Sequence, residues 1–187
     1  MYPVIRMAAE VLRARKAPPL PFDGTHVRQH ICWPWDIDPF MELNNGRTLT
    51  LYDLGRFGLF QRVGIVDVMK AQNWGGTVAG STMRYRRRLR MFDRFELRSH
   101  LIGWDDKFFY AEQSMWRNGD CASHGLLRLA ITDRKGLVRT DRVAAKCDHN
   151  PVSPPLPDWV RAWIDADATR PWPPMEKAPT TAEQIAA

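Results

Sequence analysis

The sequence predicts an α+β domain in which a curled antiparallel sheet encloses a single apolar helix. Residues 46–63 place apolar side chains on nearly every side of a helical projection, and a helix that is apolar all round is buried. The segments from residue 77 to residue 132 have the pattern of long strands joined by short turns, and Asn118-Gly119 is a strong hairpin signal. A helix followed by consecutive strands is an α+β arrangement, and a sheet curled around the helix satisfies both observations.

The chain has 187 residues, of which 44% are hydrophobic, so we expect one substantial core and little room for a second domain. We divide the chain into three parts: a basic helix with a Pro-rich connector (residues 1–24), the folded domain (residues 25–134), and a C-terminal extension with a short docked helix and a frayed tail (residues 135–187).

The N-terminal helix is interrupted by charged residues and is too short to span a bilayer. We favour a helix that packs on its own domain. The alternative is a basic amphipathic helix that rests on a membrane face or on a partner, so peripheral membrane contact stays open.

Residues 25–33 are predicted to form the first strand, because their side chains alternate between two faces. The alternation assigns Val27, Gln29, Ile31 and Trp33 to the buried face, and His26, Arg28, His30 and Cys32 to the polar face. We expect no metal site at these histidines, because no acidic ligands share a recognisable spacing with them.

In the central helix, Gly55 and Gly58 are tolerable if the backbone packs closely against the sheet, and Asp53 should pair with Arg56 at i, i+3. The remaining elements follow in order: a short helix at 64–73, a turn at 74–76, a long strand at 77–91 with a β-bulge near 86–88, strands at 95–102, 107–117 and 121–132, a short helix at 140–147, and a helix at 159–168 that we expect to dock.

The loop between the first strand and the central helix has the residues of a site. Asp36 and Asp38 lie in an apolar, Pro-broken stretch, and Asn44-Asn45-Gly46 stands immediately before the helix. Asn is a favoured N-cap, and the backbone N–H groups at a helix start polarise a carbonyl or bind an anion. The alternative is an ordinary turn, in which either Asp forms a cap or an Asx-turn.

These residues also carry a resemblance to a known family. The pattern resembles hotdog-fold acyl-CoA thioesterases of the 4-hydroxybenzoyl-CoA thioesterase type, in particular the branch of thioesterase superfamily member 6-like proteins, over about residues 25–133. The residues that carry it are Asp36-x-Asp38, Leu43-Asn44-Asn45-Gly46-Arg47 and Tyr52-Asp53-x-x-Arg56. Two departures concern the substrate pocket: Glu42-Leu43 stands where many relatives carry His, and Thr48 where they carry an aromatic residue.

The resemblance implies a hotdog fold and a thioester hydrolase without cofactor or metal. It implies that Asp38 acts at the thioester carbonyl as general base or nucleophile, and that the N–H of Asn45 or Gly46 polarises that carbonyl. Family sites lie between subunits, and a lone hotdog sheet leaves edge strands uncovered, so a homodimer or a dimer of dimers is expected.

The formal net charge of +6 is concentrated between Arg84 and Arg90. Guanidinium groups suit phosphate oxygens, so this cluster is the candidate groove for coenzyme A. The alternative for any individual arginine is a solvated strand face. The candidate substrate-binding residues are Asp36, Asn44, Arg84, Arg86, Arg87 and Arg88.

Other activities are less well supported by the sequence. It contains no nucleophile elbow, Walker loop, Rossmann glycine pattern or zinc signature. The main alternative is a non-catalytic acyl-thioester or lipid-binding protein that uses the same groove. A dehydratase is disfavoured because no His follows Asp38 until His100, and nucleic-acid binding is disfavoured because one basic strand lacks an aromatic platform. Three cysteines without metal-ligand spacing indicate free thiols in a reducing compartment, the cytoplasm.

Overall fold

The structure is a computed structural model that describes residues 2–173. It divides into two compact units, Met1–Pro154 and Pro155–Ala187. The elements of the larger unit are α1 (Val4–Lys16), β1 (His26–Ile31), η1 (Pro34–Asp36), α2 (Asn45–Arg62), α3 (Ile65–Gln72), β2 (Gly75–Tyr85), β3 (Arg94–Trp104), β4 (Phe109–Arg117), β5 (Asp120–Asp133), β6 (Gly136–Leu137) and α4 (Thr140–Lys146).

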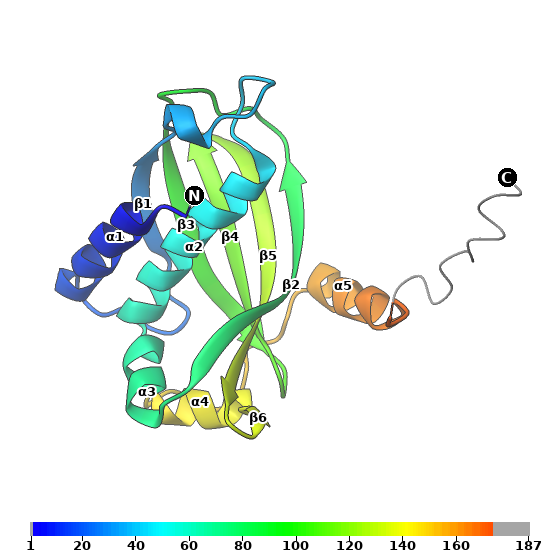
Figure 1. Ribbon diagram of the computed structural model, residues 1–187. Helices are drawn as coiled ribbons and strands as arrows, with labels where there is room; N and C mark the ends of the chain where they lie inside the picture. Colours follow the sequence, from blue (N-terminus) through cyan, green and yellow to red (C-terminus); the bar gives the residue numbers. More distant parts are fainter. Residues whose placement is uncertain (1, 174–187) are drawn as a thin grey trace, which may run out of the picture. The chain divides into compact units, whose positions relative to one another are not determined.

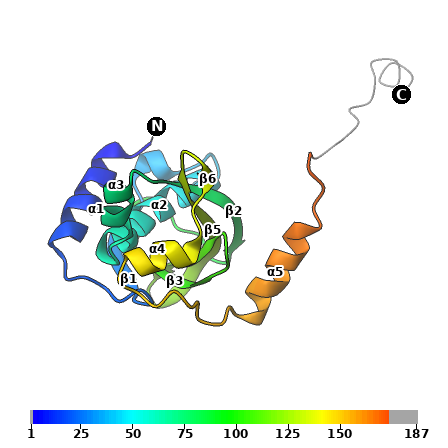
Figure 2. The ribbon, with the colours of Figure 1, turned by 90° about the horizontal axis from the view of Figure 1, so that it is seen from below.

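The sheet is antiparallel, with strand order β1-β3-β4-β5-β2 and β6 paired to β5. It curls around α2, which lies along its concave face (Figures 1 and 2). The predicted α+β fold, a curled antiparallel sheet around one helix, is confirmed. Strands β1 and β2 form the two edges of the sheet.

Helix α2 packs so closely on the sheet that a Cβ atom at two of its positions would force a neighbouring side chain to shift. A Cβ atom at Gly55 would collide with Ser99 Oγ, and a Cβ atom at Gly58 would collide with the His26 ring. Glycine at these two positions costs helix propensity, but it allows the helix backbone to approach the sheet. The buried residues of α2 are Thr48, Leu51, Tyr52, Leu54, Gly55, Arg56, Gly58 and Leu59.

The prediction for the faces of β1 was wrong. His26 is 2% exposed and Val27 is 42% exposed, the reverse of the expected order. The reason is that α1 and α2 supply polar partners on the inner side: Glu10 Oε1 lies 3.1 Å from His26 Nε2, and Arg62 NH1 lies 3.2 Å from His26 Nδ1. A strand face with satisfied polar groups can be buried.

Strand β2 is shorter than predicted. It ends at Tyr85, and its irregularity lies between Val78 and Gly80 instead of near residues 86–88. Beyond Tyr85 the N–H groups of Arg86 and Arg87 both donate to Ala122 O, at 2.8 and 3.0 Å, so the chain turns away from the ladder.

The Asn118-Gly119 hairpin is confirmed: both residues have positive φ, 52° and 86°, as a type I′ turn requires. Among residues 2–173, none of the helices is long and apolar enough to cross a membrane. The smaller unit contains α5 (Asp158–Ala168), whose expected docking stays a prediction. The expected frayed tail lies outside the described residues.

Candidate active site

The loop before α2 folds as a small hairpin with Asp38 near its tip. Ile37 and Leu43 form an antiparallel bridge, and Asn44 N donates to Asp36 O at 3.0 Å. Closer to the tip, Asp38 N donates to Glu42 O at 2.9 Å. The hairpin therefore places Asp36 opposite Asn44 at the start of α2, and Asp38 opposite Glu42 toward the tip.

One carboxylate oxygen of Asp38 is held by the hairpin backbone. Oδ1 accepts the N–H of Phe40 at 2.9 Å and the N–H of Glu42 at 3.3 Å, which is an Asx-turn. Within residues 2–173 no donor reaches Oδ2. The turn thus fixes the direction of a half-buried carboxylate and leaves one oxygen available for chemistry.

Asp36 lies in a different environment, although it is only two residues away. Its side chain is 0% exposed, with Arg6 NH1 2.8 Å from Oδ2 and Arg47 Nε 2.9 Å from Oδ1. The N–H of Trp33 also donates to Oδ2, at 3.0 Å. A fully buried carboxylate offers no surface to a substrate, so this geometry favours a structural role for Asp36, and its predicted substrate contact stays a prediction.

Helix α2 begins with the predicted N-cap. Asn44 has extended backbone angles, and its Oδ1 accepts the N–H of Arg47 at 3.1 Å. The N–H groups of Asn45 and Gly46 meet no acceptor in the described part of the chain. These two donors and the helix dipole give the loop end of α2 a partial positive charge.

A hollow of about 250 Å³ lies between the start of α2 and the segment that follows β2. Four of the predicted residues line it: Asn45, Arg86, Arg87 and Arg88. The other predicted residues, Asp36, Asp38, Asn44, Gly46 and Arg84, do not line it. Asp38 is nevertheless linked to it through Glu42, its neighbour across the hairpin, which forms part of the wall.

The predicted site residues did not include four polar residues of this hollow, Glu42, Thr48, Tyr85 and Ser123. Glu42 pairs with Arg88, whose Nε lies 2.8 Å from Glu42 Oε2. Ser123 Oγ lies 2.9 Å from the hydroxyl of the buried Tyr52. Glu42 could have been found from the sequence, because it is a carboxylate only four residues after Asp38. Nothing local marks Ser123, which comes from β5.

A larger, mostly apolar cavity of about 590 Å³ lies between α2, α3 and the start of β2. Its apolar lining consists of Phe57, Phe60, Val66, Met69, Trp74, Val78, Leu129, Ala130 and Ile131. At one side stand Asp53 and Arg56, which form the predicted ion pair. Burial lowers the pKa of Arg56, whose NH1 also donates to Gln113 Oε1 at 2.9 Å.

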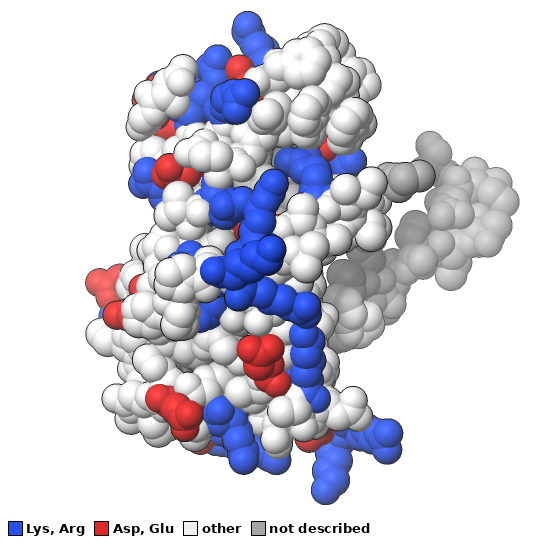
Figure 3. Space-filling view, turned by 90° about the vertical axis from the view of Figure 1, so that its left-hand side faces the viewer, with Lys and Arg blue, Asp and Glu red and all other residues white. Residues whose placement is uncertain are grey.

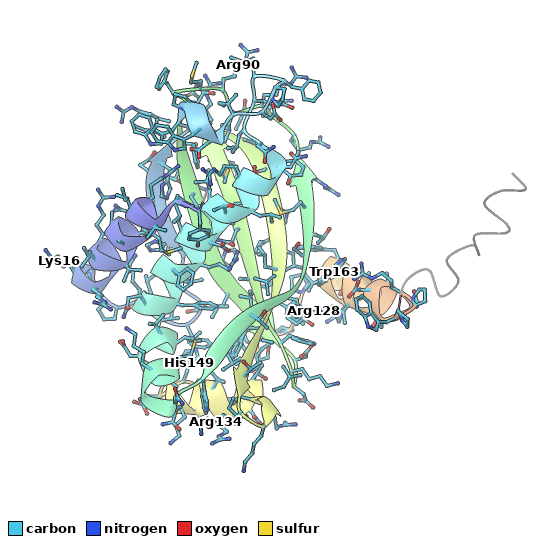
Figure 4. The ribbon with its side chains drawn as sticks, in the orientation of Figure 1. Lys16, Arg90, Arg128, Arg134, His149 and Trp163 are labelled. Atoms are coloured by element: carbon cyan, nitrogen blue, oxygen red, sulfur yellow. The ribbon has the colours of Figure 1, made fainter. Side chains whose placement is uncertain are left out.

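Exposed arginines surround the loop end of the domain. Arg84, Arg86, Arg87, Arg88 and Arg90 are all exposed. Figure 4 shows Arg90 at this end and Arg134 at the opposite end. No group of three His, Cys, Asp or Glu side chains within residues 2–173 is placed to hold a metal ion.

Comparison with known proteins identifies the superfamily of the chain. The family model described as "Thioesterase-like superfamily" matches residues 32–164. The chain belongs to the thioesterase-like superfamily. It is 34% identical to Protein THEM6 of Xenopus laevis over 164 residues. The alignment covers 86% of this chain and 77% of that protein. The superfamily match begins at Cys32 and includes the whole hairpin and α2.

Solved structures support the hotdog fold of this superfamily member. The YbaW probable thioesterase of Escherichia coli aligns with a TM-score of 0.60 at 19% identity, over 64% of this chain and 94% of that chain. The DHNA-CoA thioesterase of Staphylococcus aureus aligns with a TM-score of 0.57 at 15% identity, over 77% of this chain and 91% of that chain.

Proposed function

We propose that this protein is an acyl-CoA thioesterase that hydrolyses an acyl-coenzyme A to the free acid and coenzyme A. The class, a thioester hydrolase, follows from the superfamily. The observation that carries the finer proposal is the hairpin. It holds Asp38 by one oxygen, it leads directly into a helix start with two N–H groups that meet no acceptor in the described residues, and its Glu42 lines the arginine-lined hollow.

In the proposed reaction the substrate carbonyl oxygen accepts the N–H of Asn45 or Gly46, which stabilises the charge that develops there. Asp38 Oδ2 takes a proton from water, and the hydroxide adds to the carbonyl carbon. The C–S bond then breaks, and the thiolate of coenzyme A takes up the proton. Alternatively Asp38 attacks the carbon directly, the C–S bond breaks and the thiolate of coenzyme A leaves; water then hydrolyses the resulting anhydride, which releases the acid and supplies the proton that the thiolate takes up.

The surrounding surface supports a coenzyme A ester as substrate. Arg86, Arg87 and Arg88 line the hollow next to Asn45 and suit phosphate oxygens. We assign the acyl group to the apolar 590 Å³ cavity. The first residue of α2 that lines this cavity is Asp53. It comes eight residues after Asn45, which is about 12 Å along the helix axis.

We further propose a homodimer or a dimer of dimers, supported by the unpaired edge of β2, where residues 75–79 are all exposed. We propose the cytoplasm as the compartment, supported by three free thiols, Cys32, Cys121 and Cys147. Peripheral membrane contact through α1 stays a proposal too, supported by the exposed Val4, Ile5 and Leu12 on a basic helix.

The test is a panel of acyl-CoA esters of increasing chain length, with detection of the free thiol, for the wild type and Asp38→Ala. We expect turnover by the wild type and loss of turnover by the variant, with acyl-CoA binding retained in both. Binding without turnover in the wild type would instead favour a non-catalytic acyl-thioester or lipid-binding protein.

A further inference from the structure

The N-terminal helix α1 reaches the catalytic hairpin through one side chain. Arg6 NH1 lies 2.8 Å from Oδ2 of the fully buried Asp36, and Arg6 NH2 donates to Ile31 O at 3.3 Å. The Arg6 side chain is itself only 18% exposed. A residue thirty positions earlier in the chain therefore supplies a charge partner beneath the loop that carries Asp38.

Asp36 is the point where three elements meet. Arg6 comes from α1, Arg47 comes from the first turn of α2, and the N–H of Trp33 comes from the chain that leaves β1. The backbone oxygen of Asp36 also accepts the N–H of Asn44, the N-cap of α2. The orientation of Asp36 therefore sets both strands of the hairpin relative to the start of α2.

A second contact holds α1 independently of this loop. Glu10, on the same face of α1 as Arg6, is 1% exposed. Its Oε1 lies 3.1 Å from His26 Nε2, and its Oε2 lies 3.3 Å from Arg28 Nε. Docking of the helix and support of the hairpin thus depend on different residues and can be separated by substitution. Figure 3 shows that other basic side chains also gather on the face that carries α1.

We infer that Arg6 is a positioning residue of the thioesterase site: through Asp36 it fixes the hairpin that carries Asp38 relative to the start of α2, where the N–H donors lie. This inference rests on the proposed function. Arg6 does not line the arginine-lined hollow, so the substitution should act on the catalytic step. A small misplacement of a reacting group costs up to about a hundredfold in rate, whereas ground-state binding at the arginine-lined hollow is untouched.

The experiment compares Arg6→Met, Arg6→Lys and two controls on the same helix. Arg13→Met makes the same chemical change at an exposed position, and Glu10→Gln weakens the other anchor of α1. For each protein, kcat and KM are measured with one acyl-CoA ester, and backbone hydrogen exchange of residues 33–44 is measured by mass spectrometry.

For Arg6→Met we expect kcat to fall by at least about tenfold, KM to change by less than about threefold, and exchange of residues 33–44 to become faster. Arg6→Lys keeps the charge and should recover part of kcat. Arg13→Met and Glu10→Gln should retain the wild-type kcat, even if Glu10→Gln lowers the melting temperature.

An equal loss of kcat in Glu10→Gln would overturn the inference, because the effect would then belong to docking of α1 as a whole. An active wild type with unchanged kcat in Arg6→Met would also overturn it and leave the proposed function standing. An inactive wild type would overturn the proposed function, and the positioning role with it.

Discussion

Asp36 and Asp38 are two residues apart, yet the fold gives them opposite surroundings. Asp36 is buried between two guanidinium groups, and Asp38 is held only by backbone N–H groups at the tip of a hairpin. The same chemical change should therefore have different consequences at the two positions. On this contrast we propose Asp38 as the residue that reacts and Asp36 as the residue that supports it.

We expect Asp38→Asn to lower kcat by about a hundredfold or more, because it removes the charge but keeps the shape and the Asx-turn acceptor. Its melting temperature should stay near that of the wild type. Asp36→Asn should instead destabilise the fold by about 3 kcal/mol, because Arg6 and Arg47 lose their counter-charge in a buried site. Steady-state kinetics and urea unfolding of both variants provide the check; normal turnover by Asp38→Asn would show that the catalytic assignment is wrong.

Arg87 is the arginine best suited to a direct test of coenzyme A binding. It lines the hollow, and its guanidinium has no ion-pair partner within the described residues, whereas Arg88 is paired with Glu42. Arg87→Glu should raise KM for a coenzyme A ester by about tenfold, and should change KM much less for a short thioester that lacks the nucleotide.

Arg134→Glu is the matched control, because Arg134 is exposed at the opposite end of the domain (Figure 4). It should leave both values of KM unchanged. Equal increases for both substrates in Arg87→Glu would mean that the arginine supports the site structurally.

At the residue level the sequence predicts the loop and the cap well, because their signals are local. Asn44 before an apolar helix is sufficient to predict the N-cap. The burial of Asp36 was not predictable in this way, because its partner Arg6 comes from a helix whose docking depends on the whole domain. Nothing local distinguishes a carboxylate that is ion-paired from one that is exposed.

At the level of elements, the contact between α2 and β1 depends on the absence of a side chain. Gly58→Ala should destabilise the protein by about 1 to 3 kcal/mol despite the better helix propensity of alanine, because the new Cβ atom meets the His26 ring. That ring cannot easily move, since Glu10 and Arg62 hold both of its nitrogens. Thermal and urea unfolding measure the change; a more stable variant would mean that the ring gives way.

The polar inner face of β1 predicts a pH dependence. Burial, followed by the charge of Arg6, lowers the pKa of His30 from 6.5 to about 4. Below about pH 6.5 the His30 side chain therefore binds a proton in the unfolded chain but not in the folded chain. Stability is complete above this pH and falls as the pH decreases toward 4, by up to about 3 kcal/mol.

Urea unfolding between pH 7 and pH 5 should detect this loss, and His30→Gln should reduce it. The window avoids Glu112, whose pKa is lowered from 4.5 to about 2 by hydrogen bonds from His100 and His124, so that its contribution decreases only below about pH 4.5. An unchanged slope in His30→Gln would place the titration elsewhere.

The faces of β1 show why element-level prediction is limited. Alternation identifies a strand and its two faces, but which face is buried depends on what packs against it. Here α1 brings Glu10 to the polar face, so His26 turns inward. The end of β2 is likewise set by Ala122, whose carbonyl accepts two N–H groups from a segment that has the pattern of a continuing strand.

At the level of the whole molecule, the helix-then-strands order was sufficient to predict the fold, because one apolar helix and a run of antiparallel strands have few ways to bury each other. The arginine-lined hollow was only half predictable. The sequence shows that Arg86, Arg87 and Arg88 are adjacent to one another, but not that they lie beside the start of α2. The far wall, at Ala122 and Ser123, comes from β5.

The last prediction concerns assembly and is based on the two edge strands of the sheet. Val78 on β2 is 46% exposed and Val27 on β1 is 42% exposed, so the two valines are similar side chains on opposite edge strands. A long uncovered edge strand is a template for pairing with a second chain, and we propose that β2 is the edge that pairs. The wild type should then have at least twice the 21.6 kDa chain mass in light scattering at micromolar concentration.

Val78→Arg should produce the monomer and lose thioesterase activity with it, because a charge inserted into a closed interface is not solvated. Val27→Arg, the matched change on the other edge, should remain a dimer and stay active. A monomeric wild type would contradict the prediction, and dissociation by Val27→Arg alone would move the interface to β1. Since Val78 also lines the apolar cavity, a Val78→Arg variant that stays dimeric but loses activity would assign that loss to the cavity instead of the interface.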